Sequence, residues 1–392
     1  MPVPKPSMWE DLTVADVVSN VFVETATLGI VFFLGAMVGS FVNVVLYRMP
    51  RRMNLLWPPS RCPSCANRLK LVDNVPVVGW LRLRGKCRHC GAAIPRSYLR
   101  IEVGFGLLFL ALMYLEVHTG SWNLPLKTRA HHIGALWTIW YPNPEILRIY
   151  GYHALLAAFL ATLFLFVRRG ERLPGLLVLA GLLLASLLPI WSPTLQQVPW
   201  GSVSEGAPRG VPTTGFVDSL VGLSVGIALG TALGITWPKP PAHRSAFGSR
   251  LAIPTRWDFA VVLSLAGAWL GWQALVSVAL VTALVGVFRP KAQPVTLAVG
   301  SVAMQVVCWR LLTEHLPWWP GPHTGLPLMA GWVVLVVVLI PTRRALVARV
   351  EPKAPTAVTA ISEESPSTDQ SQKAPATRAG DSVADSENGT LA

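Results

Sequence analysis

Charged residues are scarce in this chain, and their scarcity excludes most classes of soluble protein. Asp, Glu, Lys and Arg make up 14% of the 392 residues, whereas hydrophobic residues make up 52%. A soluble domain carries about 25% charged residues. Several apolar runs approach the length of about 20 residues that spans a bilayer. Since backbone groups in lipid must pair within their own segment, the composition predicts a helical protein that crosses the lipid bilayer several times.

Acidic residues are almost absent between residues 48 and 100. That segment holds twelve Lys or Arg and a single acid, Asp73. It lies between two apolar runs, and short basic loops beside spans stay on the cytoplasmic side. We therefore expect this loop in the cytoplasm and residues 1–24 outside. The formal net charge of +13 then reflects orientation in the membrane, and no nucleic-acid partner is expected.

Cysteine is also rare, with five residues in the chain, and four of them form two C-x-x-C pairs. The pairs are Cys62 with Cys65 and Cys87 with Cys90. Two such pairs can supply the four thiolates of a tetrahedral zinc site. Spare thiols or two disulfides are the alternatives, but a cytoplasmic loop is in a reducing compartment, which favours thiolates on zinc. The fifth cysteine, Cys308, lies in an apolar run and is expected to be a packing residue.

The apolar runs divide the rest of the chain into spans. We expect spans at residues 25–47, 101–117, 151–167, 173–191, 215–237, 294–312 and 326–341, and two short helices within residues 258–288. The two short helices are expected to break near Gly271, because a single span there would place the basic cluster at Arg289 outside. The expected fold is an all-α polytopic bundle of about eight or nine transmembrane helices. Its four-cysteine loop, residues 48–100, connects the first two helices.

Aromatic residues are absent from residues 351–392, which are rich in Ala, Pro, Ser and Thr and carry seven acids and three bases. This composition predicts a disordered cytoplasmic tail. The remainder is expected to comprise an amino-terminal region at residues 25–117 and a multi-helix membrane domain at residues 118–350. The adjacent His131 and His132 stand in a polar loop, where we do not expect them to bind a metal.

The region around the cysteines carries an ordered series of motifs. In chain order they are Gly-Ser-Phe-x-Asn-Val-x-x-Tyr-Arg-x-Pro at residues 39–50, Cys-Pro-x-Cys at 62–65, Asp-Asn-x-Pro at 73–76 and Trp-Leu-x-x-Arg-Gly-Lys-Cys-Arg-x-Cys at 80–90. This series resembles the amino-terminal half of the type IV prepilin peptidases. The resemblance implies a membrane-embedded aspartic endopeptidase that cuts the leader from prepilins and pseudopilins. Many members of that family also methylate the new amino terminus with S-adenosylmethionine.

Other residues extend the resemblance. The polar residues that match the family's pattern are Asn43, Arg48, Asp73, Asn74, Arg84 and Glu102. An acid at the start of the second span, such as Glu102, can pair with arginines of the loop. The runs Phe216–Gly226, which contains Asp218, and Leu265–Leu275, which contains Gly-Ala-Trp-Leu-Gly, are similar to later family helices. Residues 297–311 have no counterpart and look like an insertion.

The resemblance also implies two catalytic aspartates, and this chain lacks both at the expected positions. Two neighbouring acids cannot both ionise cheaply, so one activates water while the other holds a proton. Val167 stands at the first position and Phe259 at the second. The remaining candidates are Asp258, one residue early, and Glu171. Alternatively, Asp258 is an acid that favours a helix amino terminus, and Glu171 is a solvated acid flanked by arginines.

The sequence is compatible with three functions. The first is an aspartic endopeptidase that removes leaders, with or without methyl transfer. The second is a catalytically inactive relative that acts as a membrane scaffold for pilin-like precursors or type II secretion components. The third is methyl transfer alone, which the matching polar residues would fit. The expected partners are prepilin or pseudopilin precursors and the lipid bilayer. Structural zinc is the expected cofactor, and methyl transfer would add S-adenosylmethionine.

Overall fold

A computed structural model of the chain describes the helices and the cysteine loop. The described residues are 13–119, 123–124, 143–196, 213–235, 237, 256–289, 292–316, 319, 330–339 and 345. The tail expected at residues 351–392 and the His131–His132 pair lie outside them. Within the described residues every regular element is helical, and extended pairing is limited to two isolated bridges in the cysteine loop.

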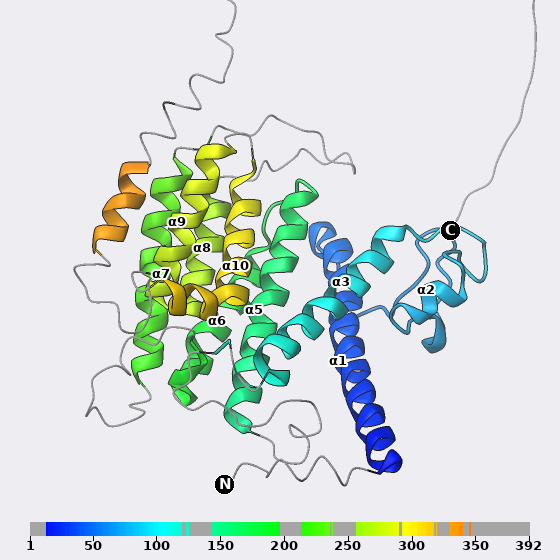
Figure 1. Cartoon of the computed structure of the whole chain (residues 1–392). Coiled ribbons are helices and arrows are strands. Elements are labelled where there is room, and N and C mark those ends of the chain that lie inside the picture. The colour runs from blue at the N-terminus through cyan, green and yellow to red at the C-terminus, as the bar shows by residue number, and fades with distance from the viewer. Residues whose placement is uncertain are drawn as a thin grey trace, which may run out of the picture. The chain divides into compact units, whose positions relative to one another are not determined.

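Helices α1 (Val14–Arg48) and α3 (Arg96–Met113) form an antiparallel pair at the amino-terminal end of the chain (Figure 1). Their backbones approach closely at glycines. A Cβ atom on Gly35 would lie 2.5 Å from the Phe105 carbonyl oxygen, and one on Gly39 would lie 2.9 Å from the Ile101 carbonyl oxygen. Small residues allow such approach between helices in lipid. The glycine of the Gly-Ser-Phe motif therefore has a packing role.

Both helices are longer than the apolar runs predicted. Helix α1 begins eleven residues before the expected start at residue 25, because the polar residues that precede the run still continue the helix. Helix α3 begins at Arg96 and continues beyond Met113 as a single π-helical segment, η4 (Tyr114–His118). Apolar composition predicts the part of a helix that lies in lipid, so it misses polar turns that extend beyond it.

Helices α7 (Thr213–Gly234) and α8 (Arg256–Leu270) form the second close pair. Three glycines at every fourth position of α7 face α8. Gly222 lies against Gly267, Gly226 against Leu263 and Ser264, and Gly230 against Ala260. A Cβ atom at any of the three glycines would overlap backbone atoms of α8. The family-like glycines of residues 216–226 therefore allow two helices to pack backbone to backbone.

The expected break at Gly271 is confirmed. Helix α8 ends at Leu270, Gly271 has a φ of 91°, and α9 (Trp272–Phe288) begins at the next residue. That φ lies in the region that glycine tolerates and side chains rarely adopt. The Trp269 ring just before the break is fully buried, and its Nε1–H donates to the Gly181 carbonyl 3.1 Å away. The Gly-Ala-Trp-Leu-Gly motif thus forms the core and the turn between α8 and α9.

The remaining helices complete the bundle (Figure 1). They are α5 (Pro144–Arg168), α6 (Gly175–Trp191), the 3-10 turn η5 (Pro193–Leu195), α10 (Pro294–His315) and an unlabelled helix at Ala330–Leu339. Helix α5 starts seven residues before the expected Gly151. Its first turn is stabilised by Asn143, whose side-chain oxygen accepts from the backbone N–H groups of Glu145 and Ile146, and by Pro144, whose fixed φ suits a first helical position.

Four described helices are long and apolar enough to cross a membrane. They cover Val17–Arg51, Arg96–His118, Pro144–Arg168 and Gly215–Gly234. Five shorter apolar helices of 10–17 residues accompany them among the described residues. The chain is therefore a helical membrane protein, as its composition predicts.

Candidate functional site

The two C-x-x-C pairs form two knuckles with the same backbone geometry. In the first, Ala66 N–H donates to Cys62 O at 2.9 Å, and in the second, Gly91 N–H donates to Cys87 O at 3.0 Å. Ala66 and Gly91 both have positive φ, 56° and 68°. An isolated bridge closes each knuckle, Arg61 with Arg68 and Lys86 with Ala93. The repeated turn directs both cysteines of each pair toward the other pair.

The four sulfur atoms form one compact cluster. Cys62 Sγ lies 3.8 Å from Cys90 Sγ, Cys65 Sγ lies 4.0 Å from Cys87 Sγ, and all four lie within 4.8 Å of one another. A tetrahedral zinc ion with Zn–S bonds of about 2.3 Å separates its sulfurs by about 3.8 Å. The arrangement therefore fits a four-coordinate structural metal. Backbone N–H groups of Cys65 and Ser64 lower the pKa of the Cys62 thiol to about 6, whereas burial and the neighbouring cysteines raise the pKa of the Cys90 thiol to about 11.

The short helix α2 (Val78–Arg82) connects the two knuckles, and its Trp80 fixes the second one. Trp80 Nε1–H donates to the Ile94 carbonyl at 3.3 Å, and Ile94 N–H donates back to the Gly85 carbonyl at 2.7 Å. Gly85 has a φ of 67°, and a Cβ there would lie 2.7 Å from the Trp80 ring. The Trp-Leu-x-x-Arg-Gly-Lys-Cys motif is thus a packing unit that orients Cys87.

An ion pair joins the segment before α2 to the second knuckle. The Arg88 guanidinium contacts the Asp73 carboxylate with two hydrogen bonds, of which Nε to Oδ2 measures 2.8 Å. The paired Arg88 lowers the pKa of the Asp73 carboxyl below its usual value. Two-pronged pairs of this kind fix geometry as well as charge. Asp73, the only acid of the basic loop, therefore holds the loop in its folded form.

The base of the hairpin is fixed by Arg48 and Asn43. The buried Arg48 guanidinium donates to the carbonyls of Asn54, Leu55 and Pro58 at 3.0, 3.0 and 2.6 Å. Asn43 Nδ2 donates to the Tyr98 carbonyl of α3 at 3.2 Å. These two residues connect α1 to both ends of the loop. We call residues 48–100 in this folded form the hairpin.

Glu102 joins the hairpin to α3. Its Oε2 accepts the backbone N–H of Val77 at 2.7 Å, and the side chain is largely buried. Val77 has a φ of 63°, a conformation that strains a β-branched residue. The carboxylate that could have paired with a loop arginine is therefore hydrogen-bonded to a strained backbone turn.

Replacing Glu102 with alanine is expected to loosen this turn. The half-buried Val77 N–H would lose its carboxylate acceptor, and a hydrogen bond to a charged group contributes about 1.5–3 kcal/mol. Hydrogen exchange at Val77 and its neighbours should therefore accelerate about tenfold or more. The Glu102→Gln variant keeps an oxygen acceptor and should exchange at nearly the wild-type rate. Equal acceleration in both variants would show that charge, and not the hydrogen bond, fixes the turn.

The structure places the two candidate carboxylates on different elements. Asp258 lies in the first turn of α8, and Glu171 follows the carboxyl end of α5. Among the described residues Glu171 Oε2 is buried without a hydrogen-bond partner, and burial raises the pKa of this carboxyl, an effect that nearby Arg169 and Arg51 oppose. Arg169 Nη1 also donates to the Leu46 carbonyl at 3.4 Å. The turn with Glu171 therefore lies beside the base of the hairpin.

Hydrophobic core residues occupy the two positions at which the resemblance places aspartates. Val167 is 2% exposed within α5, and Phe259 is fully buried in α8 with its ring 5.5 Å from the ring of Trp237. Neither position could accept an ionised carboxylate without a partner that replaces its hydration. Both side chains therefore contribute to core packing.

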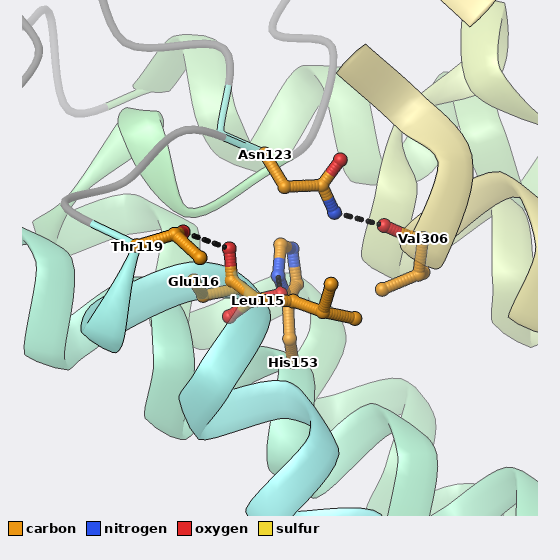
Figure 2. A network of polar contacts seen from close by, with 6 residues as sticks. All are labelled: Leu115, Glu116, Thr119, Asn123, His153 and Val306. Carbon is orange, nitrogen blue, oxygen red and sulfur yellow. Dashed lines mark hydrogen bonds and ion pairs between the residues drawn. The ribbon is translucent and has the colours of Figure 1, made fainter. Parts of the chain in front are cut away.

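Sequence reasoning missed one buried ionisable pair. Glu116 of η4 and His153 of α5 are each 1% exposed, and His153 Nδ1 lies 2.7 Å from Glu116 Oε1 (Figure 2). Each stands in an apolar run, where a single acid or histidine is the signal that could have identified it.

Comparisons with known proteins agree with this geometry. Residues 33–116 match the family described as the bacterial peptidase A24 N-terminal domain. Three relatives are named prepilin leader peptidase/N-methyltransferase. The relative from Dichelobacter nodosus is 41% identical over 19% of this chain. The relative from Myxococcus xanthus (strain DK1622) is 45% identical over 21% of this chain. The one from Dickeya chrysanthemi is 29% identical over 64% of this chain.

These alignments differ in how much of each relative they cover. The chain spans 36% and 24% of the first two relatives and 78% of the third. No solved structure matches the chain. The family match covers α1 from residue 33, the hairpin and α3, where the cysteines and the matching polar residues form a single folded unit. Residues 33–116 are therefore similar to the A24 N-terminal domain, and the chain resembles relatives named prepilin leader peptidase/N-methyltransferase.

Proposed function

We propose that this chain removes the leader peptide from type IV prepilins or related pseudopilin precursors in the inner membrane. The observation that carries the proposal is the intact hairpin, in which four converging cysteines and the contacts of Arg48, Asp73 and Glu102 form one unit on α1 and α3. The relatives that share this domain are named prepilin leader peptidase/N-methyltransferase. The name of these relatives supplies the substrate class for the proposal.

In the proposed orientation the hairpin faces the cytoplasm. The twelve basic residues of the loop support this side by the positive-inside rule. The four long helices and five shorter apolar helices would together provide the eight or nine spans expected from the sequence. Residues 1–24 would then lie outside the membrane and the tail at residues 351–392 inside.

Zinc would have a structural role. Cys62, Cys65, Cys87 and Cys90 would hold the ion, which supplies four bonds that close the hairpin and no open coordination position for chemistry. Methyl transfer with S-adenosylmethionine is proposed only from the relatives' name. Asn43, Arg48 and Asp73 contact atoms of the chain itself, which assigns them to the fold of the hairpin.

Leader cleavage would use Asp258 and Glu171 as the acid pair. Burial favours the protonated form of Glu171, which suits the acid that polarises a scissile carbonyl. Asp258, in the first turn of α8, would take a proton from the attacking water. The products are the leader and a shortened precursor with a new amino terminus.

A second function, precursor binding without cleavage, is compatible with one observation. The buried side chains of Val167 and Phe259 occupy the positions where the family pattern places its acids. In that case the hairpin and the membrane helices would form a scaffold for pilin-like precursors.

One cleavage assay separates the two functions. Membranes containing the wild type, Asp258→Asn or Glu171→Gln are incubated with a prepilin-like substrate and S-adenosylmethionine that carries a labelled methyl group. The proposal predicts a shortened product with the wild type and at least a hundredfold less with either variant, as expected for loss of a general acid or base. Label in the product would demonstrate methyl transfer.

Two other outcomes of this assay would contradict parts of the proposal. Unchanged cleavage by Asp258→Asn would exclude Asp258 from catalysis. Absence of cleavage by all three proteins, with retention of the precursor by each, would support the scaffold function and contradict the proposed peptidase.

A further inference from the structure

An exposed apolar patch lies on the part of the hairpin between the two knuckles. It is formed by large side chains of η3 (Leu71–Asp73), of α2 and of the turn between them. These side chains are 40–88% exposed, and they are Leu71, Val72, Val75, Val78 and Leu81. Helix α2 packs directly on η3, because a Cβ atom on Gly79 would overlap the Asp73 carbonyl. A contiguous apolar patch of this kind marks an interaction surface.

The turn that carries the patch folds back along α1 and α3. Val77, inside this turn, donates its N–H to the Glu102 carboxylate, and the Glu102 backbone packs against Gly39 of α1. Gly39 stands nine residues before the end of α1 at Arg48, which is about 14 Å along the helix axis at about 1.5 Å per residue. The patch is therefore held beside the helix pair and does not extend away from it.

The surface of α1 at this level is apolar. Met37 and Phe41 stand two residues to either side of Gly39, and both side chains are exposed. They belong to a helix that is long and apolar enough to cross a membrane. Exposed apolar side chains on such a helix face lipid. A patch held near this level meets the same lipid, which removes its apolar side chains from water.

Exposed cations border the patch. Lys70 directly precedes it in the chain and Arg82 directly follows it. Both lie near enough to Asp73 to act on its carboxyl group. Asp73 is the single acid of the hairpin, and its buried carboxylate is hydrogen-bonded to Arg88. The hairpin thus presents cations at the border of the patch without an exposed acid of its own, which complements an anionic lipid surface.

A bilayer is the partner that these observations favour. The hairpin is joined at both ends to helices that are long enough to cross a membrane, so binding of the patch to the lipid surface is intramolecular. Segments with an apolar face and Lys or Arg at its border lie in the headgroup boundary of anionic membranes. We propose that residues 71–81 are embedded in this boundary and that Lys70 and Arg82 bind anionic lipid headgroups there.

The lipid contact makes the position of the hairpin depend on the composition of the bilayer. Each Lys or Arg close to an anionic surface strengthens binding about fivefold, so the two cations together contribute about 25-fold. This inference does not depend on leader cleavage or methyl transfer, because it concerns only where the hairpin rests. A failed cleavage assay would therefore leave it intact.

The test is photochemical labelling of the full chain in nanodiscs of phosphatidylcholine and phosphatidylglycerol. In two parallel samples one of these lipids carries a photoreactive group next to its headgroup, and mass spectrometry measures the lipid attached to residues 71–81. We expect about fivefold or more labelling by the anionic lipid relative to the neutral lipid at equal amounts. The variant Lys70→Gln/Arg82→Gln should lose about fivefold or more of the anionic labelling. Both side chains are exposed, so this variant keeps the internal contacts of the hairpin.

The variant Arg61→Gln/Arg68→Gln is the matched control. It removes two exposed arginines from the first knuckle and leaves the patch and its border unchanged, so the anionic labelling should stay close to the wild-type value. Equal losses in the two variants would overturn the proposal, because the attraction would then follow total charge alone. Absence of labelling in the wild type, or equal labelling by both lipids, would also overturn it. Complete loss of the label on addition of a prepilin-like peptide would assign the patch to the precursor and contradict its assignment to lipid.

Discussion

Replacing Cys62 with serine is expected to remove the bound metal and open the hairpin. Serine offers a neutral hydroxyl where the site needs a thiolate, and Cys62 Sγ lies only 3.8 Å from Cys90 Sγ in the cluster. Structural zinc sites contribute on the order of 10–16 kcal/mol of binding free energy in small domains. Metal analysis of the purified protein should fall from about one zinc per chain to near zero. Limited proteolysis should then cut within residues 66–86.

Cys308 provides the matched control for this variant. It lies in α10, outside the four-cysteine cluster. Cys308→Ser should keep the metal and the protease resistance of the hairpin. Equal zinc content in Cys62→Ser and the wild type would contradict the assignment of the cluster as a metal site.

Replacing Gly267 with alanine is expected to destabilise the membrane domain by about 2 kcal/mol or more, because overpacking a close contact forces the backbone to move. The new methyl group would overlap the Gly222 carbonyl oxygen of α7 and lie 2.7 Å from the Leu275 side chain. A backbone carbonyl cannot rotate away as a flexible side chain can. Helices α7 and α8 would have to separate along their contact. Equilibrium unfolding in detergent micelles measures the change.

Gly300→Ala is the control for Gly267→Ala. Gly300 lies in α10, and a Cβ there would have nothing within 4 Å. Since alanine favours a helix over glycine by about 1 kcal/mol, this variant should be as stable as the wild type or slightly more so. If the two variants lost stability equally, close packing of α7 against α8 would not explain the glycine pattern.

The sequence was most informative where spacing alone determines geometry. Two C-x-x-C pairs imply four ligands that converge, and the sulfurs of Cys62, Cys65, Cys87 and Cys90 do converge. The break at Gly271 could be predicted from the balance of charges on either side of residues 258–288. Element starts were less accurate. Helices α1 and α5 begin before their apolar runs, because caps and polar turns extend a helix where hydropathy gives no signal.

Contacts between distant segments could not be read from the sequence. Nothing in the order of residues shows that Glu102 accepts from Val77, or that Arg48 donates to three carbonyls of the loop. The pairing of Glu116 with His153 depends on how α3 turns against α5, which only tertiary packing decides. The acids Asp258 and Glu171 are proposed for catalysis from their positions in the chain, and the cleavage assay tests that assignment.

The most direct test of the proposed function is the mass of a prepilin's amino terminus after co-expression with this chain. The host should lack a prepilin peptidase of its own, and the precursor expressed alone provides the reference. Removal of the leader at a single site by the wild-type chain is the predicted result. A full-length precursor, unchanged by the presence of the chain, would contradict the proposal that this chain is a leader peptidase.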